Sequence, residues 1–385
     1  MLMKSGSACF IFLFMYFFFI GRRGLSSFAD DAVLIDLVAV MSILLLFICI
    51  RWRRLSVPYS HTMLFTAMFF LFMFSLPGLF EGEVSMLAID KACRVFLIWL
   101  FCVALVFTHS EDIKVLSRLA LALCVIPLFY ILQKIFLSDE VRSGFSGAGA
   151  ITTARLIMYI AFVNAWLAYN KSGNLSMRVV FILLLSGIAI AFTESRAVFL
   201  SFLVFCLISC FVAFSKKRQI ALFVFMAAVG GALLYYAQDS RIVYRLTVLM
   251  EEGGGSSVQA RVAYMSDALG FAKDYDYLGS GIGSYGYLAH GEAIFDYPHN
   301  LIVEIILEFG VFGLLALFVF LVIAFMKLIE VDFMALLIWL VALFNSFVSG
   351  DIYDNRLVFV LPFFFIYMAR LMDAKKSTTK YMVPS

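Results

Sequence analysis

The chain has 385 residues, of which 64% are hydrophobic and only 14% are charged, and its mean hydropathy is +1.01. So few charged residues cannot cover the surface of a water-soluble globule, and that class is therefore excluded. The formal net charge of +3 is small and gives no reason to expect a nucleic-acid partner.

Long apolar runs recur from one end of the chain to the other. A bilayer core ~30 Å thick is crossed by about 20 helical residues, and about twelve runs approach this length. The sequence therefore predicts an all-α, polytopic membrane protein. In chain order the runs are roughly 7–20, 32–50, 60–80, 92–108, 114–137, 153–170, 177–193, 196–214, 219–238, 299–326, 333–349 and 357–372. Gly-Arg-Arg-Gly, rather than a small-residue cleavage site, follows the first run, so we count that run as a span.

The charges between the runs predict the topology. With both termini in the cytoplasm, the inner loops carry far more Lys and Arg than Asp and Glu. This excess agrees with the positive-inside rule. The predicted parts are about nine spans in 1–238, one large outer loop at 239–297, and about three spans with a short basic cytoplasmic tail in 298–385.

The outer loop is predicted to be partly helical. Apolar residues repeat at helical spacing through 258–273, which predicts an amphipathic helix lying on the outer membrane face. These residues are Val258, Val262, Met265, Leu269 and Ala272. A long loop that carries such a pattern and several aromatic residues is expected to be ordered and functional.

Polar residues at the outer boundary are the candidate site. His61 and His109 fall on the cytoplasmic side, whereas His290 lies in the outer loop and His299 directly opens a span. Several Arg are kept on the outer side, where the positive-inside rule disfavours them. Because guanidinium groups bind phosphate oxygens in a bidentate way, this set indicates an anionic ligand. The set is Arg94, Arg142, Arg155, Arg196, Arg241, Arg245, Arg261 and Arg356.

Two further patterns allow alternative interpretations. The glycine-rich segment 279–286, which contains Gly281 and Gly283, is either a phosphate cradle or a tight turn that returns the loop to the span. Asp274 and Asp276 have the spacing of a divalent-cation site, as do Glu81 and Glu83, although a solvated acidic loop is the commoner meaning. The seven Cys lie in apolar runs without metal or disulfide spacing.

Three segments stand in an order that resembles a known family. They are TESRAVFL, then QARVAYMSDAL with the glycine-rich turn, then PHNLIVEIILEFGVFGLL. Together they resemble the O-antigen ligase and O-antigen polymerase family of bacterial membrane glycosyltransferases. The last segment matches its pattern at His299, Asn300, Glu308, Gly310 and Gly313. The resemblance covers about 195–325 by motif, and Glu194 stands where a small or hydroxyl residue is more usual.

The resemblance implies a fold, a reaction and a location. Family members are helical inner-membrane proteins of the GT-C type that take a glycan from undecaprenyl diphosphate on the periplasmic face. A ligase transfers the glycan to the lipid A core, and a polymerase transfers it to the next lipid-linked repeat. The resemblance also implies that His299, Arg196 and Arg261 are required and that no metal or cofactor is needed. Membrane lipids are expected neighbours, and a chain-length regulator is a further candidate partner.

Elementary chemistry agrees with these roles. A sugar hydroxyl that attacks the donor needs a base near neutral pH, which suits His299. The departing diphosphate is stabilised by positioned donors, for which we expect Arg196, Arg261, Asn300, Gly281 and Gly283. Glu308 lies about 13 Å further along the helix, at ~1.5 Å per residue, which is too deep for the same carbon. We expect Glu308 to pair with a buried Arg or to make a structural hydrogen bond.

The choice between polymerase and ligase stays open at this stage. The Phe-rich composition resembles that of sequences from polysaccharide gene clusters, and this resemblance favours a polymerase. A polysaccharide transporter or flippase is the alternative from another class, because many spans with charged residues also suit a transporter. Transporters, however, place their sites at the midplane in broken helices and carry internal repeats, and the charges here gather at one face.

Overall fold

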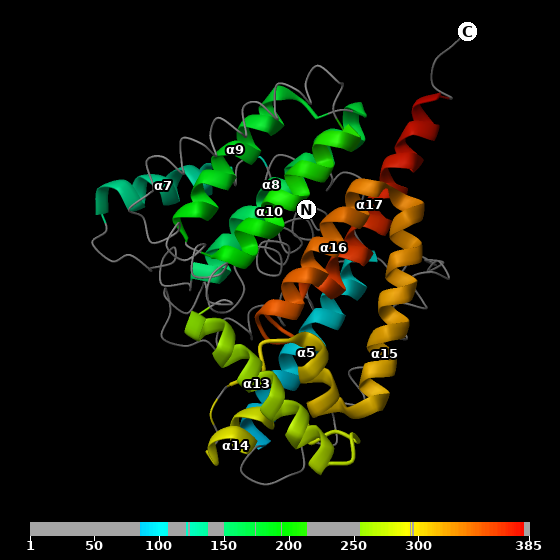
Figure 1. The fold of residues 1–385 in the computed structure, drawn as a ribbon. Coiled ribbons are helices and arrows are strands. Elements are labelled where there is room, and N and C mark those ends of the chain that lie inside the picture. The colour runs from blue at the N-terminus through cyan, green and yellow to red at the C-terminus, as the bar shows by residue number, and fades with distance from the viewer. Residues whose placement is uncertain are drawn as a thin grey trace, which may run out of the picture. The chain divides into compact units, whose positions relative to one another are not determined.

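The computed structural model describes residues 85–106, 121, 124–137, 150–213 and 255–380, except positions 174, 194, 293 and 295. The expected spans at 7–20, 32–50, 60–80 and 219–238 lie outside the described residues, as do His61, His109, Glu81, Glu83 and Glu194. Every regular element in the described part is a helix, which confirms the all-α prediction (Figure 1).

The described helices belong to two compact units, which we treat separately. The first contains α7 (Val125–Leu137), α8 (Ala150–Ser172), α9 (Met177–Phe192) and α10 (Arg196–Ala213). Within it, α9 packs against α7, α8 and α10, and α8 also packs against α10. The Phe162 ring stacks on Phe202 with a centroid separation of 5.9 Å and also contacts Phe205.

The start of α7 differs from the expected span at 114–137. Cys124 lies in a turn, and its backbone N–H donates to Leu121 O. Helix α7 begins only at Val125. Pro127 lacks an N–H, but in the first turn of a helix that N–H has no intrahelical partner. Pro127 therefore favours a helix that starts here over one that runs through this position.

The second unit contains α5, the end of the large loop and the C-terminal helices. Its α15 packs against α16 and α17, and α5 packs along α17. Trp339 donates its Nε1–H to Val358 O at 2.9 Å and so ties α16 to α17. The bounds are α5 (Ser85–Val106), α13 (Gly255–Asp274), α14 (Tyr285–His290), α15 (Leu301–Val331), α16 (Phe333–Val348) and α17 (Leu357–Lys380).

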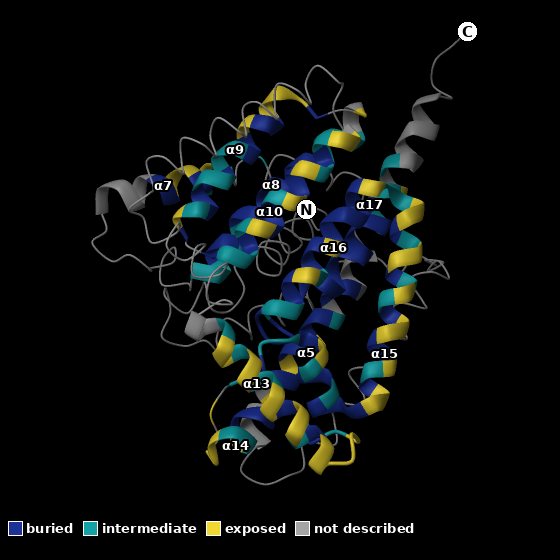
Figure 2. Ribbon diagram, in the orientation of Figure 1, coloured by how far each residue is buried: buried dark blue, intermediate teal, exposed yellow. Residues whose placement is uncertain are grey.

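Two of the described helices have the length and apolar composition needed to span a membrane. They are Ala150–Asn170 and Leu301–Val331, and four shorter apolar helices accompany them. Exposed residues recur along the long second half of α15 (Figure 2). These residues are large and apolar, among them Phe312, Leu315 and Phe318, which suits a face turned to lipid. The count of about twelve spans stays a prediction.

The large loop contains the expected helix, but only part of the expected apolar face is buried, with Ala272 buried and Val258 and Met265 half-buried. In α13 the fully buried residues are Ala268 and Ala272, which pack with Tyr285 and Leu307. Val262 and Leu269, expected on the apolar face, are exposed. Tyr285 comes from α14 and Leu307 from α15, so contacts with these two helices decide which residues of α13 are buried.

The helix expected to run unbroken through 299–326 is interrupted. Gly310 has φ 68° and ψ −167°, so α15 consists of a short first half, which ends at Phe309, and a long second half. The glycine-rich turn supplies hydrogen bonds at the break. The N–H groups of Ser280 and Gly281 donate to Leu307 O and Glu308 O, and the N–H of Val311 donates to Tyr277 O.

Gly310 and Gly279 make this close contact possible. A Cβ at Gly310 would lie 2.3 Å from Leu278 O, and one at Gly279 would lie 2.9 Å from Gly310 N. Both glycines also have positive φ, which costs other L-residues conformational energy. The two glycine-containing motifs of the sequence are therefore the two sides of one backbone contact.

Gly310→Ala is expected to destabilise this unit by on the order of 1–3 kcal/mol, because it combines a left-handed backbone with a backbone clash. The matched control is Gly270→Ala on α13, where an added Cβ meets nothing within 4 Å. The control should be neutral or slightly stabilising, since Ala is the better helix former. Thermal unfolding of the purified variants checks this, and equal stability of the two variants would contradict it.

Candidate functional site

His299 is held by aromatic rings just before α15 begins. Its imidazole stacks on Tyr264 of α13 with a centroid separation of 5.8 Å and meets the edge of Tyr297 at 4.5 Å. The His299 backbone has φ 59°, a left-handed conformation that is uncommon for residues other than glycine. Such strain persists where the surrounding structure enforces it, and it gathers at functional sites.

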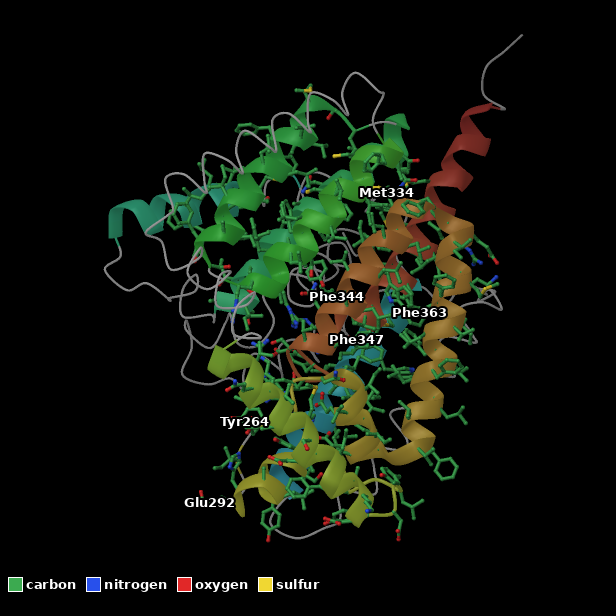
Figure 3. All side chains as sticks on the ribbon, in the orientation of Figure 1. Tyr264, Glu292, Met334, Phe344, Phe347 and Phe363 are labelled. Atoms are coloured by element: carbon green, nitrogen blue, oxygen red, sulfur yellow. The ribbon has the colours of Figure 1, made fainter. Side chains whose placement is uncertain are left out.

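Asn300 and Arg261 converge on the carboxyl end of α16. Asn300 caps α15, because its Oδ1 accepts from the N–H groups of Ile302 and Val303, while its Nδ2 donates to Phe347 O at 2.9 Å. Arg261 Nη1 donates to Val348 O at 3.1 Å. In Figure 3, Met334 and Phe347 mark the two ends of α16, and Phe347 lies at the end nearer Tyr264.

The contacts bring His299, Asn300 and Arg261 together in this unit. Arg261 and Tyr264 lie one helical turn apart on α13, so the helix that positions the guanidinium also supplies the ring stacked on His299. The two tyrosines were not singled out in the sequence. Tyr264 lies far from His299 in the sequence, so nothing in the sequence indicated that the two rings stack. Tyr297, by contrast, stands in the same short segment as His299.

His290 was expected in a loop, but a helix and a side-chain contact fix its orientation. It is the last residue of α14, and its Nε2 lies 2.9 Å from Asp296 Oδ2. Nearby, burial raises the pKa of Tyr285, to which the charges of Asp296 and Asp267 add. The Tyr285 hydroxyl therefore stays protonated and can donate to Tyr264 O, at 3.4 Å.

Backbone N–H groups of the glycine-rich turn donate to acceptors on α15. The N–H of Gly281 donates to Glu308 O, and the backbone of Gly283 hydrogen-bonds the Glu308 carboxylate. This geometry supports the tight-turn interpretation directly. A role for Gly281 and Gly283 in phosphate binding stays a prediction.

Glu308 forms a buried ion-pair cluster that the sequence did not indicate in full. Lys91 Nζ of α5 lies 2.6 and 2.7 Å from the two Glu308 oxygens and 2.5 Å from Glu304 Oε1. All three residues are at most 2% exposed. The expected partner of Glu308 was an Arg, and the structure has a Lys instead. Lys91 stands at the edge of an apolar run, and no spacing in the sequence links it to Glu308.

Two Arg of the outer set lie in the same unit, one on α5 and one in the α16–α17 connection, and both contact the ring of Tyr353. The guanidinium of Arg94 lies 5.6 Å from the Tyr353 ring centroid, and that of Arg356 lies 5.3 Å from it. Both Arg are buried. Two cations at one ring show that Arg94 and Arg356 contribute to packing, and ligand binding by the Arg set stays a prediction.

The remaining predicted residues are only partly described. Arg196 is half-buried at the start of α10, in the other unit, so its relation to His299 stays a prediction. Arg142, Arg241 and Arg245 lie outside the described residues. Asp274 ends α13, and Asp276 follows it in a turn with φ 51°. In the described ranges, no group of three or more His, Cys, Asp or Glu could hold a metal ion.

Comparison with known proteins finds one family that is similar to part of the chain. A family model described as O-antigen ligase matches residues 181–318, a range that includes Arg196, Arg261 and His299. No curated protein matches the chain. Residues 181–318 are therefore similar to the O-antigen ligase family, in agreement with the resemblance that the motifs of the sequence indicate.

Proposed function

We propose that the protein transfers an O-antigen-type glycan from an undecaprenyl-diphosphate donor to a sugar hydroxyl at the periplasmic face of the inner membrane. The family match supports ligase- or polymerase-type activity in general. Polymerisation onto the next lipid-linked repeat is the form that we favour, and ligation to the lipid A core is the alternative.

The observation that carries the proposal is the setting of His299. A strained histidine stands at the mouth of a membrane-length apolar helix, fixed between two tyrosines, and Arg261 lies one turn from the stacking ring. A lipid-linked sugar diphosphate needs this combination at the membrane boundary, because its tail is apolar, its diphosphate is anionic, and its acceptor is a neutral hydroxyl.

In the proposed reaction, the acceptor hydroxyl oxygen forms a bond to the anomeric carbon of the donor. The bond between that carbon and the diphosphate oxygen breaks, and undecaprenyl diphosphate leaves. His299 takes the hydroxyl proton as general base. Arg261 and Arg196 bind the diphosphate and stabilise the negative charge that grows on the leaving oxygen. Asn300 holds the start of α15 against α16 and thereby keeps His299 in place.

A deletion strain tests the proposal and separates its two forms. Loss of the polymerase leaves lipopolysaccharide that carries a single repeat unit. Loss of the ligase removes all O-antigen glycan from lipid A, so that lipid-linked chains accumulate. A strain with unaltered lipopolysaccharide and unaltered lipid-linked glycans would contradict both forms.

Chelation by EDTA is expected to leave turnover unchanged. In the proposed site the arginines supply the charge stabilisation that a divalent cation provides in metal-dependent transferases. The measurement is glycan transfer by the purified protein before and after EDTA treatment. Loss of turnover that magnesium or manganese restores would support a cation site at Asp274 and Asp276 instead.

One observation favours a transporter as the second candidate. The break in α15 at Gly310 lies beside the buried charges of Lys91, Glu304 and Glu308, and discontinuous helices with charged groups are common in transporters. The two candidates differ in chemistry, because a transporter moves the lipid-linked glycan without making or breaking a glycosidic bond.

A further inference from the structure

We infer that Lys91 is a positioning residue of the transfer site, acting from α5 through its ion pairs with Glu304 and Glu308. This inference rests on the proposed function. Lys91 lies outside the residues that match the family model, and no motif of the sequence includes it.

The short first half of α15 is the element that presents the candidate base. His299 and Asn300 stand directly before it, and Asn300 O accepts from Glu304 N–H at 2.9 Å, which places Glu304 in the first turn. Gly310 ends this half-helix with a non-helical backbone, so the two halves do not form one continuous helix. The half-helix therefore depends on side-chain and turn contacts for its orientation.

Glu304 and Glu308 lie one turn apart on this half-helix, and both reach Lys91. Glu308 is also bound by the backbone of Gly283, and its carbonyl accepts from Gly281. The cluster therefore joins α5, the first half of α15 and the glycine-rich turn. Asp351, in the α16–α17 connection, interacts electrostatically with Lys91 and brings a fourth segment into it.

Burial of the Lys91, Glu304 and Glu308 side chains favours one fixed geometry for this cluster. Charged groups removed from water are retained only with close partners, and the loss of one partner leaves an uncompensated charge. Because Lys91 holds two carboxylates on successive turns, its ammonium sets the angle of the half-helix as well as its distance from α5. A displacement of about 1 Å at a reacting group is enough to cost ~10²-fold in rate.

The first variant is Lys91→Met, for which we expect turnover to fall about 10²-fold. The matched control is Lys327→Met in the second half of α15, which removes an exposed pair with Glu330 at 2.8 Å and should leave turnover unchanged. A fall in turnover alone does not separate positioning from folding, because Lys91→Met leaves two buried carboxylates without this cation.

A neutral triple variant, with Lys91→Met, Glu304→Gln and Glu308→Gln, separates the two roles. It removes the buried charges together, so membrane abundance and thermal stability should return to near those of the wild type. Turnover should stay low, because neutral groups do not fix the half-helix in the same way. The charge exchange Lys91→Glu with Glu308→Lys re-forms a pair and should recover part of the turnover.

Hydrogen exchange of the full chain in lipid nanodiscs reports on the same claim without activity. Lys91→Met should speed exchange in peptides that cover 299–309 and 277–284, with 333–348 unchanged. Recovery of full turnover by the neutral triple variant, or wild-type exchange in Lys91→Met, would overturn the inference. Wild-type protein that transfers no glycan while these exchange effects hold would instead overturn the proposed function and keep the structural role of Lys91.

Discussion

His299→Ala is expected to abolish glycan transfer while the protein still binds its lipid-linked donor. The acceptor hydroxyl loses its general base, a contribution typically worth about 10²–10⁴-fold in rate. The donor diphosphate is held by other residues in the proposed site, so its affinity should change little. The measurements are glycan transfer and donor binding by the purified variant in reconstituted membranes.

His290→Ala is the matched control, because His290 lies in the same outer loop region. It is a demanding control, since His290 ends α14 and pairs with Asp296 at 2.9 Å, which is the kind of contact that orients a catalytic histidine. We expect turnover close to that of the wild type. An inactive His290→Ala variant beside an active His299→Ala variant would assign the base to the His290–Asp296 pair instead.

Arg261→Lys and Arg196→Lys are each expected to lower turnover by roughly 10²–10³-fold, the usual cost of removing one positioned charge-stabilising donor. Lysine keeps the charge but loses the planar fork that binds two phosphate oxygens at once. At Arg261 the change also removes the guanidinium that donates to Val348 O from α13. Turnover and donor affinity should be measured separately for each variant.

Arg370→Lys supplies the control for this pair, because Arg370 is exposed in the second half of α17, on the predicted cytoplasmic side. The double variant adds a further test. If Arg196 and Arg261 hold one diphosphate, their effects should be non-additive. Near-normal transfer by Arg261→Lys would refute the bidentate role, and fully additive effects would place the two arginines at separate sites.

The features that could be predicted from the sequence are those set by local composition. The helices at Met177–Phe192 and Phe333–Val348 end within a residue of the apolar runs that predicted them, because hydrophobic length determines both. Asn300, which we expected to bind the diphosphate, stands directly before an apolar run as an N-cap does, and its side chain accepts from the N–H groups of Ile302 and Val303.

The features that could not be predicted depend on contacts between distant segments. Hydropathy continues on both sides of Gly310, so nothing local reveals the break, which exists because Leu278 O and Gly279 lie against it. Lys91 and Glu308 are 217 positions apart, and a single lysine at the edge of a run gives no sign of its partner. The burial of Ala268 in α13 and the exposure of Val262 and Leu269 likewise depend on contacts with Tyr285 and Leu307, which the pattern of α13 does not reveal.

We propose above all that this protein forms a new glycosidic bond and releases undecaprenyl diphosphate from the donor. The direct measurement uses the purified full-length protein in proteoliposomes with a radiolabelled undecaprenyl-diphosphate oligosaccharide as both donor and acceptor. We expect glycans of more than one repeat unit to form, free undecaprenyl diphosphate to appear in equal amount, and both products to be absent with His299→Ala. Movement of intact donor between leaflets without either product would contradict the account and identify a transporter.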